Sequence, residues 1–334
     1  MAGDVILLAA SFAVILTGAI VFTNAVEWLG HRLGIGEGAV GSLLAAVGTA
    51  MPESLIPIVA VIQGGEGSEE VAIGAIVGAP FLLATIAMLL VGLSAIAYRQ
   101  RRPQGRHLDA HAPTLDRDLM VFLAFFAAAL VLGVLGLPTA VRAALAVGFV
   151  LGYAVYVRAT LTGGGSVQDH ETIGPLLLDR TRHGDPSMRL IMLQFAVGLG
   201  AIVGGAHLFV EELVTVAEEI GIEVLILSLV LAPLATELPE KANSFFWVRD
   251  GKDALALGNI TGAMVFQSML PVALGLVLTD WDLDRFAILS MALGLAGGVV
   301  AYWALRRRNQ FNAPAIVAWG ALYGIFLGYV LLEA

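Results

Sequence analysis

The sequence predicts an all-α membrane protein of ten transmembrane helices, built as two inverted five-helix repeats with broken helices at the midplane. Three observations predict this class. The 334 residues are 58% hydrophobic and only 13% charged, whereas soluble domains carry about 25% charged residues. The apolar residues fall into runs of spanning length. A short segment that ends in Pro-Glu occurs twice within these runs.

Charged and glycine-rich breaks separate the apolar runs, and each run is near the roughly 20 residues that a bilayer requires. The first run is too long for a signal peptide and has no basic segment before it, so we interpret it as a span. The predicted spans are 4–30, 38–63, 70–97, 118–136, 139–161, 188–212, 222–247, 253–278, 284–305 and 313–332. The polar segment 162–187 is a linker between a first repeat at 1–161 and a second at 188–334.

The distribution of basic residues predicts the orientation, because loops on the cytoplasmic side carry an excess of lysine and arginine. Arginines gather after the third and ninth spans, as at Arg101 and Arg307, and around the central linker, as at Arg182. The loops on the other side are acidic, as at Glu69 and Asp282. We therefore expect an integral plasma (inner) membrane protein with its N-terminus outside and residues 162–187 in the cytoplasm.

The repeat is visible at two registers. A shift of 187 residues aligns GTAMPE at 48–53 with ATELPE at 235–240, and a shift of 184 aligns the glycines of 74–79 with those of 258–263. An odd number of spans in each repeat makes the two copies run in opposite directions through the membrane. Inverted repeats with interrupted helices are typical of secondary transporters, whose ion site lies at the midplane between the halves.

Each copy places a glutamate, Glu53 or Glu240, directly after a proline and inside an apolar run. A charge at bilayer depth costs about 3 kcal/mol on insertion scales, so it indicates a functional site. Two facing carboxylates cannot both ionise cheaply without a cation between them. The alternative is a structural role, in which each glutamate caps a half-helix or pairs with a buried base.

The prolines of the two segments, Pro52 and Pro239, lack an N–H group and clash with the carbonyl four residues earlier, so we expect the helix to open there. Inside a membrane, such carbonyls require a partner from protein, water or an ion. The backbone oxygens around Thr49 and Thr236 are therefore predicted ion ligands beside the glutamates. A mixed set of carboxylate and carbonyl oxygens suits Ca²⁺, which takes about six to eight of them.

At these residues the chain resembles the cation/Ca²⁺ exchanger superfamily, which contains Na⁺/Ca²⁺ and H⁺/Ca²⁺ antiporters. The resemblance covers most of the chain and implies ten spans in a 5+5 pattern. It also implies that Glu53 and Glu240 are the acidic ligands, with backbone oxygens of Thr49 and Thr236 beside them. Spans 1 and 6 would then slide across the other eight to give alternating access.

The chain departs from the family in its second motif, a Gly-Asn-x-x-Gly-Ser-Asn-like segment. The second repeat keeps part of it as GNITGAM at 258–264, whereas the first repeat has GAIVGAP at 74–80. Leu83 and Gln267 stand where Na⁺/Ca²⁺ exchangers usually carry Asn or Asp. Most side-chain ligands for flanking Na⁺ ions are thus missing. This favours proton coupling, a reduced sodium stoichiometry, or Mg²⁺ or Mn²⁺ as the substrate.

Three more polar residues are candidates for the site. Glu237 is an extra ligand, a proton carrier or the ion-pair partner of Lys241, which is the only lysine or arginine deep in a predicted span. Asn259 either coordinates the ion or holds a break in its helix. Gln267 is either a neutral ligand or forms a helix–helix hydrogen bond. Asn24 and Gln194, which lie in other apolar runs, are predicted to form interhelical hydrogen bonds.

The sequence therefore predicts a secondary antiporter, not an enzyme, that exchanges a divalent cation, first of all Ca²⁺, for H⁺ or Na⁺. We expect no bound cofactor: the chain has no cysteine for thiolate or redox chemistry, and its net charge of −9 disfavours nucleic-acid binding. The alternatives are a Mg²⁺/Mn²⁺ exchanger of the same fold, a cation channel or uniporter, a metal-dependent membrane enzyme, and a metal sensor without transport. The oligomeric state stays open.

Overall fold

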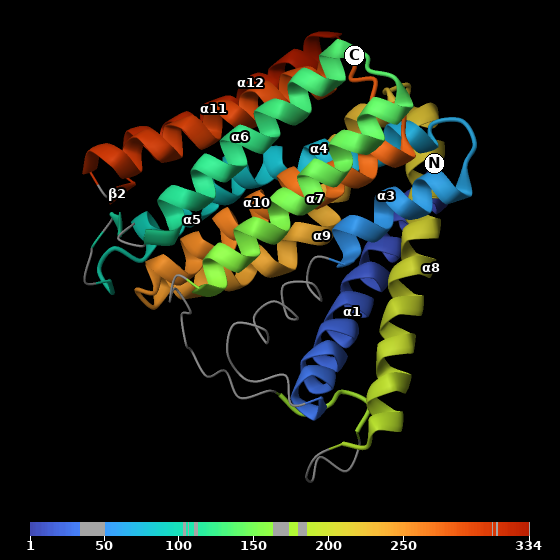
Figure 1. Ribbon diagram of the computed structural model, residues 1–334, viewed down its shortest axis with the longest axis horizontal. Helices are drawn as coiled ribbons and strands as arrows, with labels where there is room; N and C mark the ends of the chain where they lie inside the picture. The colour runs from blue at the N-terminus through green and yellow to red at the C-terminus, as the bar shows by residue number, and fades with distance from the viewer. Residues whose placement is uncertain are drawn as a thin grey trace.

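The computed structural model describes residues 1–333 apart from 34–50, 103–104, 106, 110–112, 163–173, 180–185, 309 and 312. For residues 238–243 it describes the backbone alone. Helices make up nearly all of the described chain (Figure 1). They are α1 (Ala2–Arg32), α3 (Met51–Gln63), α4 (Ser68–Leu82), the π-helix η1 (Leu83–Ala87), α5 (Met88–Ala97), α6 (Pro113–Leu135), α7 (Thr139–Thr162), α8 (Met188–Ile220), α9 (Val224–Arg249), α10 (Asp253–Leu278), α11 (Arg285–Arg308) and α12 (Ala313–Glu333).

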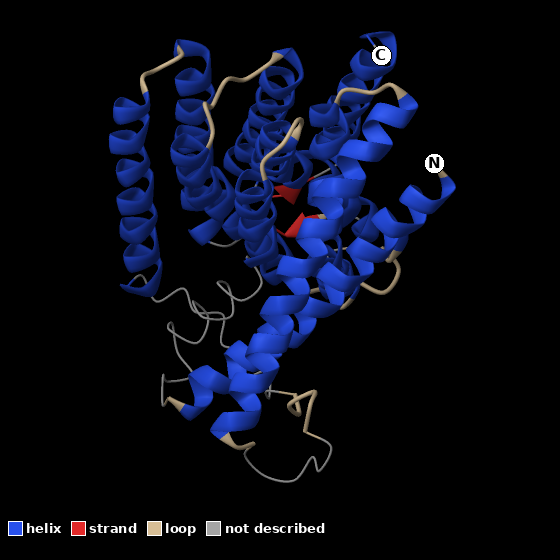
Figure 2. Ribbon diagram, turned by 90° about the vertical axis from the view of Figure 1, so that its right-hand side faces the viewer, coloured by secondary structure: helices blue, strands red, loops and turns tan. Residues whose placement is uncertain are grey.

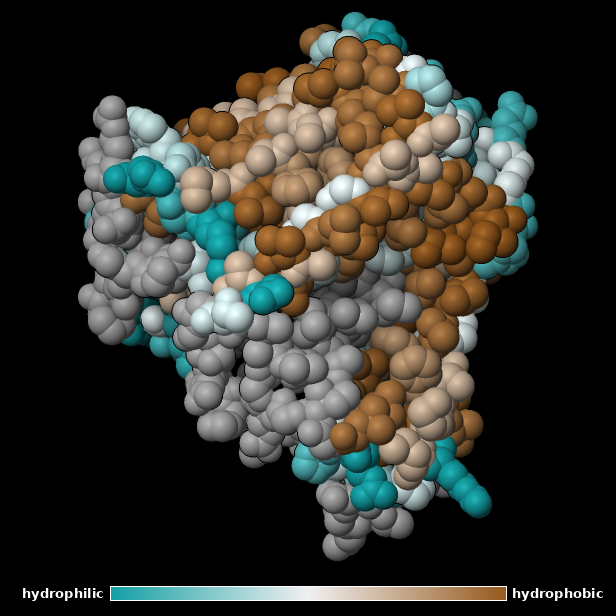
Figure 3. Space-filling view, viewed as in Figure 1, coloured by the Kyte–Doolittle hydropathy of each residue, from teal (hydrophilic) through white to brown (hydrophobic). Residues whose placement is uncertain are grey.

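Among the described residues, eight helices are long and apolar enough to cross a membrane, and Pro52–Gln63 and Val224–Glu237 are shorter apolar helices. Together they fall on the ten predicted spans, and α4, η1 and α5 form one of them, Ser68–Ala97. Much of the described surface is hydrophobic, with polar residues towards its ends (Figure 3). The prediction of an all-α membrane fold is confirmed. Two strands of two residues each, β1 (Leu108–Asp109) and β2 (Gln310–Phe311), form an antiparallel pair that the sequence did not predict.

The predicted break in the second repeat takes a different form. Helix α9 continues without interruption from Val224 to Arg249 and so passes through Pro239. Because proline has no N–H, the helix supplies no donor for the carbonyl of Ala235, one residue before Thr236. Packed neighbours let a membrane helix tolerate a proline, and α4 and α10 both contact α9. In the first repeat the described part of α3 starts at Met51, so the predicted break before Pro52 lies at the edge of the described residues.

Helices α4 and α9 lie side by side, and two glycines of α4 allow their close approach. A Cβ at Gly74 would lie 2.6 Å from Cβ of Ser228, and one at Gly78 would lie 2.5 Å from the carbonyl oxygen of Leu229. Within α9 the Leu229 carbonyl receives no hydrogen bond from residue 233, because Pro233 has no N–H. The Gly78 backbone therefore lies close to a carbonyl that has no N–H donor at Pro233.

Helices α1 and α8 form a second close pair. A Cβ at Gly198 would lie 2.6 Å from the backbone nitrogen of Phe22, and one at Gly18 would lie 2.9 Å from that of Ile202. Small residues at such positions let two membrane helices pack backbone to backbone. At one end the pair extends beyond the other helices (Figures 1 and 2).

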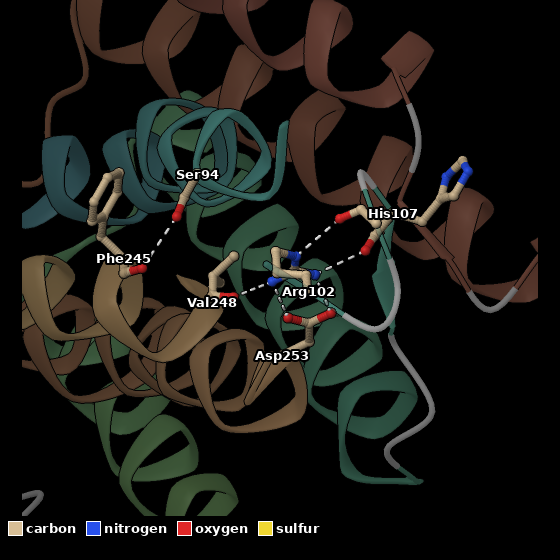
Figure 4. Close-up of polar contacts among 7 residues, drawn as sticks. Ser94, Arg102, His107, Phe245, Val248 and Asp253 are labelled. Carbon is tan, nitrogen blue, oxygen red and sulfur yellow. Dashed lines mark hydrogen bonds and ion pairs between the residues drawn. The ribbon is translucent and has the colours of Figure 1, made fainter. Parts of the chain in front are cut away.

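A buried ion pair joins the connection after α5 to the first residue of α10 (Figure 4). Arg102 donates from Nη1 and Nη2 to the two carboxylate oxygens of Asp253, each at 2.7 Å. It also donates to the carbonyls of Val248 and His107. Both charged side chains are almost fully inaccessible, at 0% and 1% exposure. Removing one partner of such a pair leaves an uncompensated charge and costs about 3–5 kcal/mol.

Candidate functional site

A buried polar pair connects the two core helices of the second repeat. Gln267 of α10 donates a hydrogen bond from Nε2 to Oε1 of Glu237 of α9 at 2.9 Å. Glu237 is 0% exposed and Gln267 is 2% exposed. A carboxylate without solvent needs compensating donors or a cation, so this pair is the centre of the candidate site. Both residues were predicted from the sequence, and the structure brings them together.

The other end of the Gln267 amide makes this pair suitable for a cation. Its Oε1 is buried and has no hydrogen-bond partner among the described residues. A glutamine side chain carries two donors on nitrogen and an acceptor on oxygen. Rotation of the amide by half a turn would present that oxygen, instead of the N–H, beside the Glu237 carboxylate. The same side chain can therefore present either a donor or an acceptor towards Glu237.

The first repeat contributes Glu53, the third residue of α3, which is buried. Helix α3 contacts both α9 and α10, the two helices that carry Glu237 and Gln267. Pro57 lies inside the same helix and has no N–H to donate to the Glu53 carbonyl. The residue thus brings a buried carboxylate, and its backbone carbonyl receives no N–H from Pro57.

Thr236 and Asn259 lie in the same two helices and have defined partners. Thr236 is buried, and its hydroxyl donates to the Ala232 carbonyl at 3.3 Å, within α9. Asn259 donates from Nδ2 to Oγ of Ser244 at 3.2 Å, which ties α10 to α9. The structure therefore gives Asn259 a helix-to-helix hydrogen bond, and its side-chain oxygen is not used in that bond.

Three candidates fall outside what the structure describes. Thr49 lies in the segment 34–50, and the side chains of Glu240 and Lys241 lie in the stretch described by its backbone alone. Within the described part of the chain, no group of three or more His, Asp or Glu side chains is arranged to hold a metal ion.

The sequence did not single out another buried carboxylate, Asp118 of α6. It accepts hydrogen bonds from Tyr156 of α7 at 2.9 Å and from Thr261 of α10 at 3.0 Å. The Arg117 guanidinium lies 3.5 Å from the same carboxylate and over the Tyr156 ring. The predicted fourth span begins at Asp118, but α6 begins at Pro113, which places the carboxylate inside the helix. The sequence feature that could have identified Asp118 is a carboxylate directly before an apolar run.

Apolar helices of spanning length that bury carboxylates and amides where they contact each other define a membrane protein that handles ions, because such groups rarely lie at bilayer depth without a functional role. Comparison with known proteins gives the family. The chain belongs to the sodium/calcium exchanger protein family, which matches residues 4–162 and 190–332.

Curated relatives agree with this assignment. The chain is 24% identical over 321 residues to the putative antiporter CaxA of Alkalimonas amylolytica, covering 93% of this chain and 92% of that protein. It is 23% identical over 261 residues to the inner membrane protein YrbG of Escherichia coli, covering 77% and 74%.

Solved structures share the fold. The crystal structure of the H⁺/Ca²⁺ exchanger CAX superposes with a TM-score of 0.72 at 19% identity, over 98% of this chain and 86% of that one. The sodium–calcium exchanger NCX_Mj superposes with a TM-score of 0.57 at 19% identity, over 97% and 98%. The predicted resemblance to the exchanger superfamily is confirmed. The protein is a membrane ion exchanger of the antiporter type and not an enzyme.

Proposed function

We propose that this protein exchanges Ca²⁺ for H⁺ at a site between α3, α9 and α10, with Glu53 and Glu240 as the acidic ligands. The observation that carries the proposal is the burial of Glu53 and Glu237, two carboxylates in apolar helices that contact one another. Backbone oxygens near Thr49 and Thr236 complete a set of hard oxygen ligands of the kind that Ca²⁺ prefers.

The Glu237–Gln267 pair favours H⁺ as the counter-ion. Gln267 is a neutral amide at a position where a second carboxylate would attract an additional Na⁺. Glu237 is held by the N–H of that amide, and a buried carboxylate can take up a proton when the divalent ion leaves. The solved neighbour CAX is named an H⁺/Ca²⁺ exchanger. Na⁺ stays the second candidate, because NCX_Mj is named a sodium–calcium exchanger.

The orientation and the division of the chain are part of the proposal. We infer that residues 1–161 and 188–334 are the two inverted repeats, with the linker 162–187 in the cytoplasm and the N-terminus outside. The distribution of arginines supports this orientation through the positive-inside rule. In a bacterial or archaeal cell the protein would lie in the plasma (inner) membrane.

The test is ion flux in liposomes that contain the purified protein. Ca²⁺ entry is followed under an imposed pH gradient, then under an imposed Na⁺ gradient. We expect the pH gradient to drive uptake, and we expect Glu53→Gln and Glu240→Gln to abolish it. Glu66→Gln is the matched control, since Glu66 is an exposed carboxylate in the loop before α4.

Other outcomes separate the alternatives. Uptake driven only by the Na⁺ gradient would mean that Na⁺, and not H⁺, is the counter-ion. Flux without any counter-ion gradient would indicate a channel or uniporter. Uptake of Mg²⁺ or Mn²⁺ in place of Ca²⁺ would change the substrate. Full Ca²⁺ uptake by the Glu53→Gln/Glu240→Gln double variant would contradict the proposed site.

A further inference from the structure

A short piece of the central linker, residues 174–179, is bound by the side chains of two helices at once. The backbone N–H of Leu178 donates to Oε1 of Gln194 of α8 at 2.8 Å. The N–H of Leu177 donates to Oδ1 of Asn24 of α1 at 3.2 Å. In Figure 1 this piece crosses between the end of α1 and the start of α8.

Gln194 is the centre of this arrangement. It is fully buried, and its Nε2 donates to the Val21 carbonyl at 3.0 Å and to Oδ1 of Asn24 at 2.8 Å. With Leu178 on its oxygen, the amide uses both donors and its acceptor. One side chain of α8 therefore holds α1 and the linker together. The sequence predicted interhelical hydrogen bonds for Asn24 and Gln194, but the linker backbone as their third partner is new.

Two further contacts fix the same piece of chain. Trp28 of α1 donates from Nε1 to the carbonyl of Gly174 at 2.9 Å. The Leu176 side chain is buried, although its neighbours Leu177 and Leu178 are exposed. A loop that is bound through its backbone and anchored by one apolar side chain is specifically docked.

We propose that residues 174–179 act as a clasp that joins the ends of α1 and α8 into one body, with Gln194 as its positioning residue. Further along the two helices, glycines bring their backbones into contact. At the clasped end the pair extends beyond the other helices that the structure describes (Figures 1 and 2). The clasp supplies the connection at that end.

The consequence for transport rests on the proposed function. Exchange requires that the ion site become accessible from each side in turn, so some helices must move relative to others. With the clasp closed, α1 and α8 move together and carry the linker with them. Opening the clasp then lowers the turnover rate but leaves ion affinity unchanged, because Gln194 and Asn24 do not belong to the ion site.

The first test does not depend on transport. The chain has no cysteine, so Leu176→Cys provides a single thiol at the buried anchor. We expect Gln194→Leu to accelerate maleimide labelling of this thiol about tenfold, as the loss of buried hydrogen bonds predicts. Thr17→Val is the matched control, since Thr17 bonds only to a carbonyl of its own helix, that of Ala13. Equal labelling rates with and without Gln194→Leu would overturn the clasp.

The second test addresses the motion. In Asn24→Cys/Gln194→Cys the two side chains that touch are replaced by thiols, and a short bifunctional thiol reagent then joins α1 to α8. We expect slow Ca²⁺ exchange before the reaction and recovery after it, with unchanged Ca²⁺ affinity throughout. Arrest of exchange by the bridge would show that the helices move against each other and would overturn the proposal. A wild-type protein without Ca²⁺ flux would refute the proposed function. The labelling rates would still show whether Gln194 holds residues 174–179 in place.

Discussion

The helix of the first repeat that runs through α4, η1 and α5 and its counterpart α10 in the second repeat differ in chemistry. Between Glu70 and Thr85 the first has only apolar residues and glycine, whereas α10 carries Asn259, Thr261 and Gln267. The two repeats therefore contribute unequally to the candidate site. Of the candidate residues, the first repeat supplies Glu53 and the second supplies most of the polar side chains.

The two helices also differ in backbone form at matched positions. Leu83, which aligns with Gln267 at a shift of 184, begins the π-helix η1, while α10 is a regular α-helix there. Pro80 lies just before the π-helix and has no N–H for the carbonyl of Ile76. π-Helical turns are frequent at functional sites. The comparison teaches that the two repeats differ at this matched position in both side chain and backbone form.

The largest expected effect comes from removing the carboxylate of Glu53, since the first repeat has fewer polar side chains than the second. Glu53 is the only ionisable residue of α3, so Glu53→Gln should lower the initial rate of Ca²⁺ uptake by about a hundredfold or more, the scale of a lost interaction with a charged group. Glu237→Gln should cost roughly tenfold, because Glu240 stays in the same helix. Equal losses of uptake in Glu53→Gln and Glu237→Gln would show that the two repeats contribute equally to transport.

The second prediction concerns the amide. Gln267→Leu removes the donor that holds Glu237, and we expect the apparent affinity for the transported ions to fall about tenfold. Ser268→Ala is the matched control, since Ser268 is buried beside it but bonds only to the Val265 carbonyl of its own helix. Uptake measured across a series of Ca²⁺ and proton concentrations gives the affinities. An unchanged affinity in Gln267→Leu would remove this residue from the site.

The third prediction makes the first repeat resemble the second. Leu83→Gln places an amide in a position that is fully buried among apolar side chains, so it should lower the free energy of unfolding by about 1–3 kcal/mol. Thermal unfolding in detergent measures this loss. Increased Na⁺-driven uptake by this variant, without a loss of stability, would instead mean that the first repeat retains a usable ligand position.

The smallest expected effect tests whether α4 and α10 are packed equally tightly at two aligned glycines. Gly78→Ala places a methyl group 2.5 Å from the Leu229 carbonyl oxygen and should cost about 1–3 kcal/mol through overpacking. Gly262→Ala, at the aligned position of α10, meets no heavy atom within 4 Å among the described residues, and we expect a change within about 0.5 kcal/mol. The two thermal unfolding curves, recorded side by side, decide this. Equal shifts would show that α4 and α10 are packed alike.

Most of the fold could be predicted from the sequence, because bilayer thickness fixes the length of an apolar run and leaves few ways to satisfy its backbone. The break at Pro239 could not. A proline removes one hydrogen bond, but whether the helix then ends depends on its neighbours, and α9 is packed against α4 and α10. The pair of short strands was missed because two residues each are too few to show a period.

The candidate site was predictable to a similar degree. Glu53, Glu237 and Gln267 stand out because polar groups are rare in apolar runs, and the structure confirms their burial. Their roles as ion ligands stay predictions. The pairing of Asn259 with Ser244 could not be foreseen, since it depends on the rotation of two helices. Asp118 was missed because a carboxylate at the edge of an apolar run is usually exposed at the membrane surface.

The Arg102–Asp253 pair has a consequence for how the protein is made. Its two members are 151 residues apart in the chain, and at synthesis rates of about 5–20 residues per second the arginine waits roughly eight to thirty seconds for its partner. Until then the first half of the nascent chain carries an uncompensated cation beside the membrane. Neither half can complete its assembly alone, so we expect the halves, expressed as separate polypeptides, to be degraded unless they are produced together.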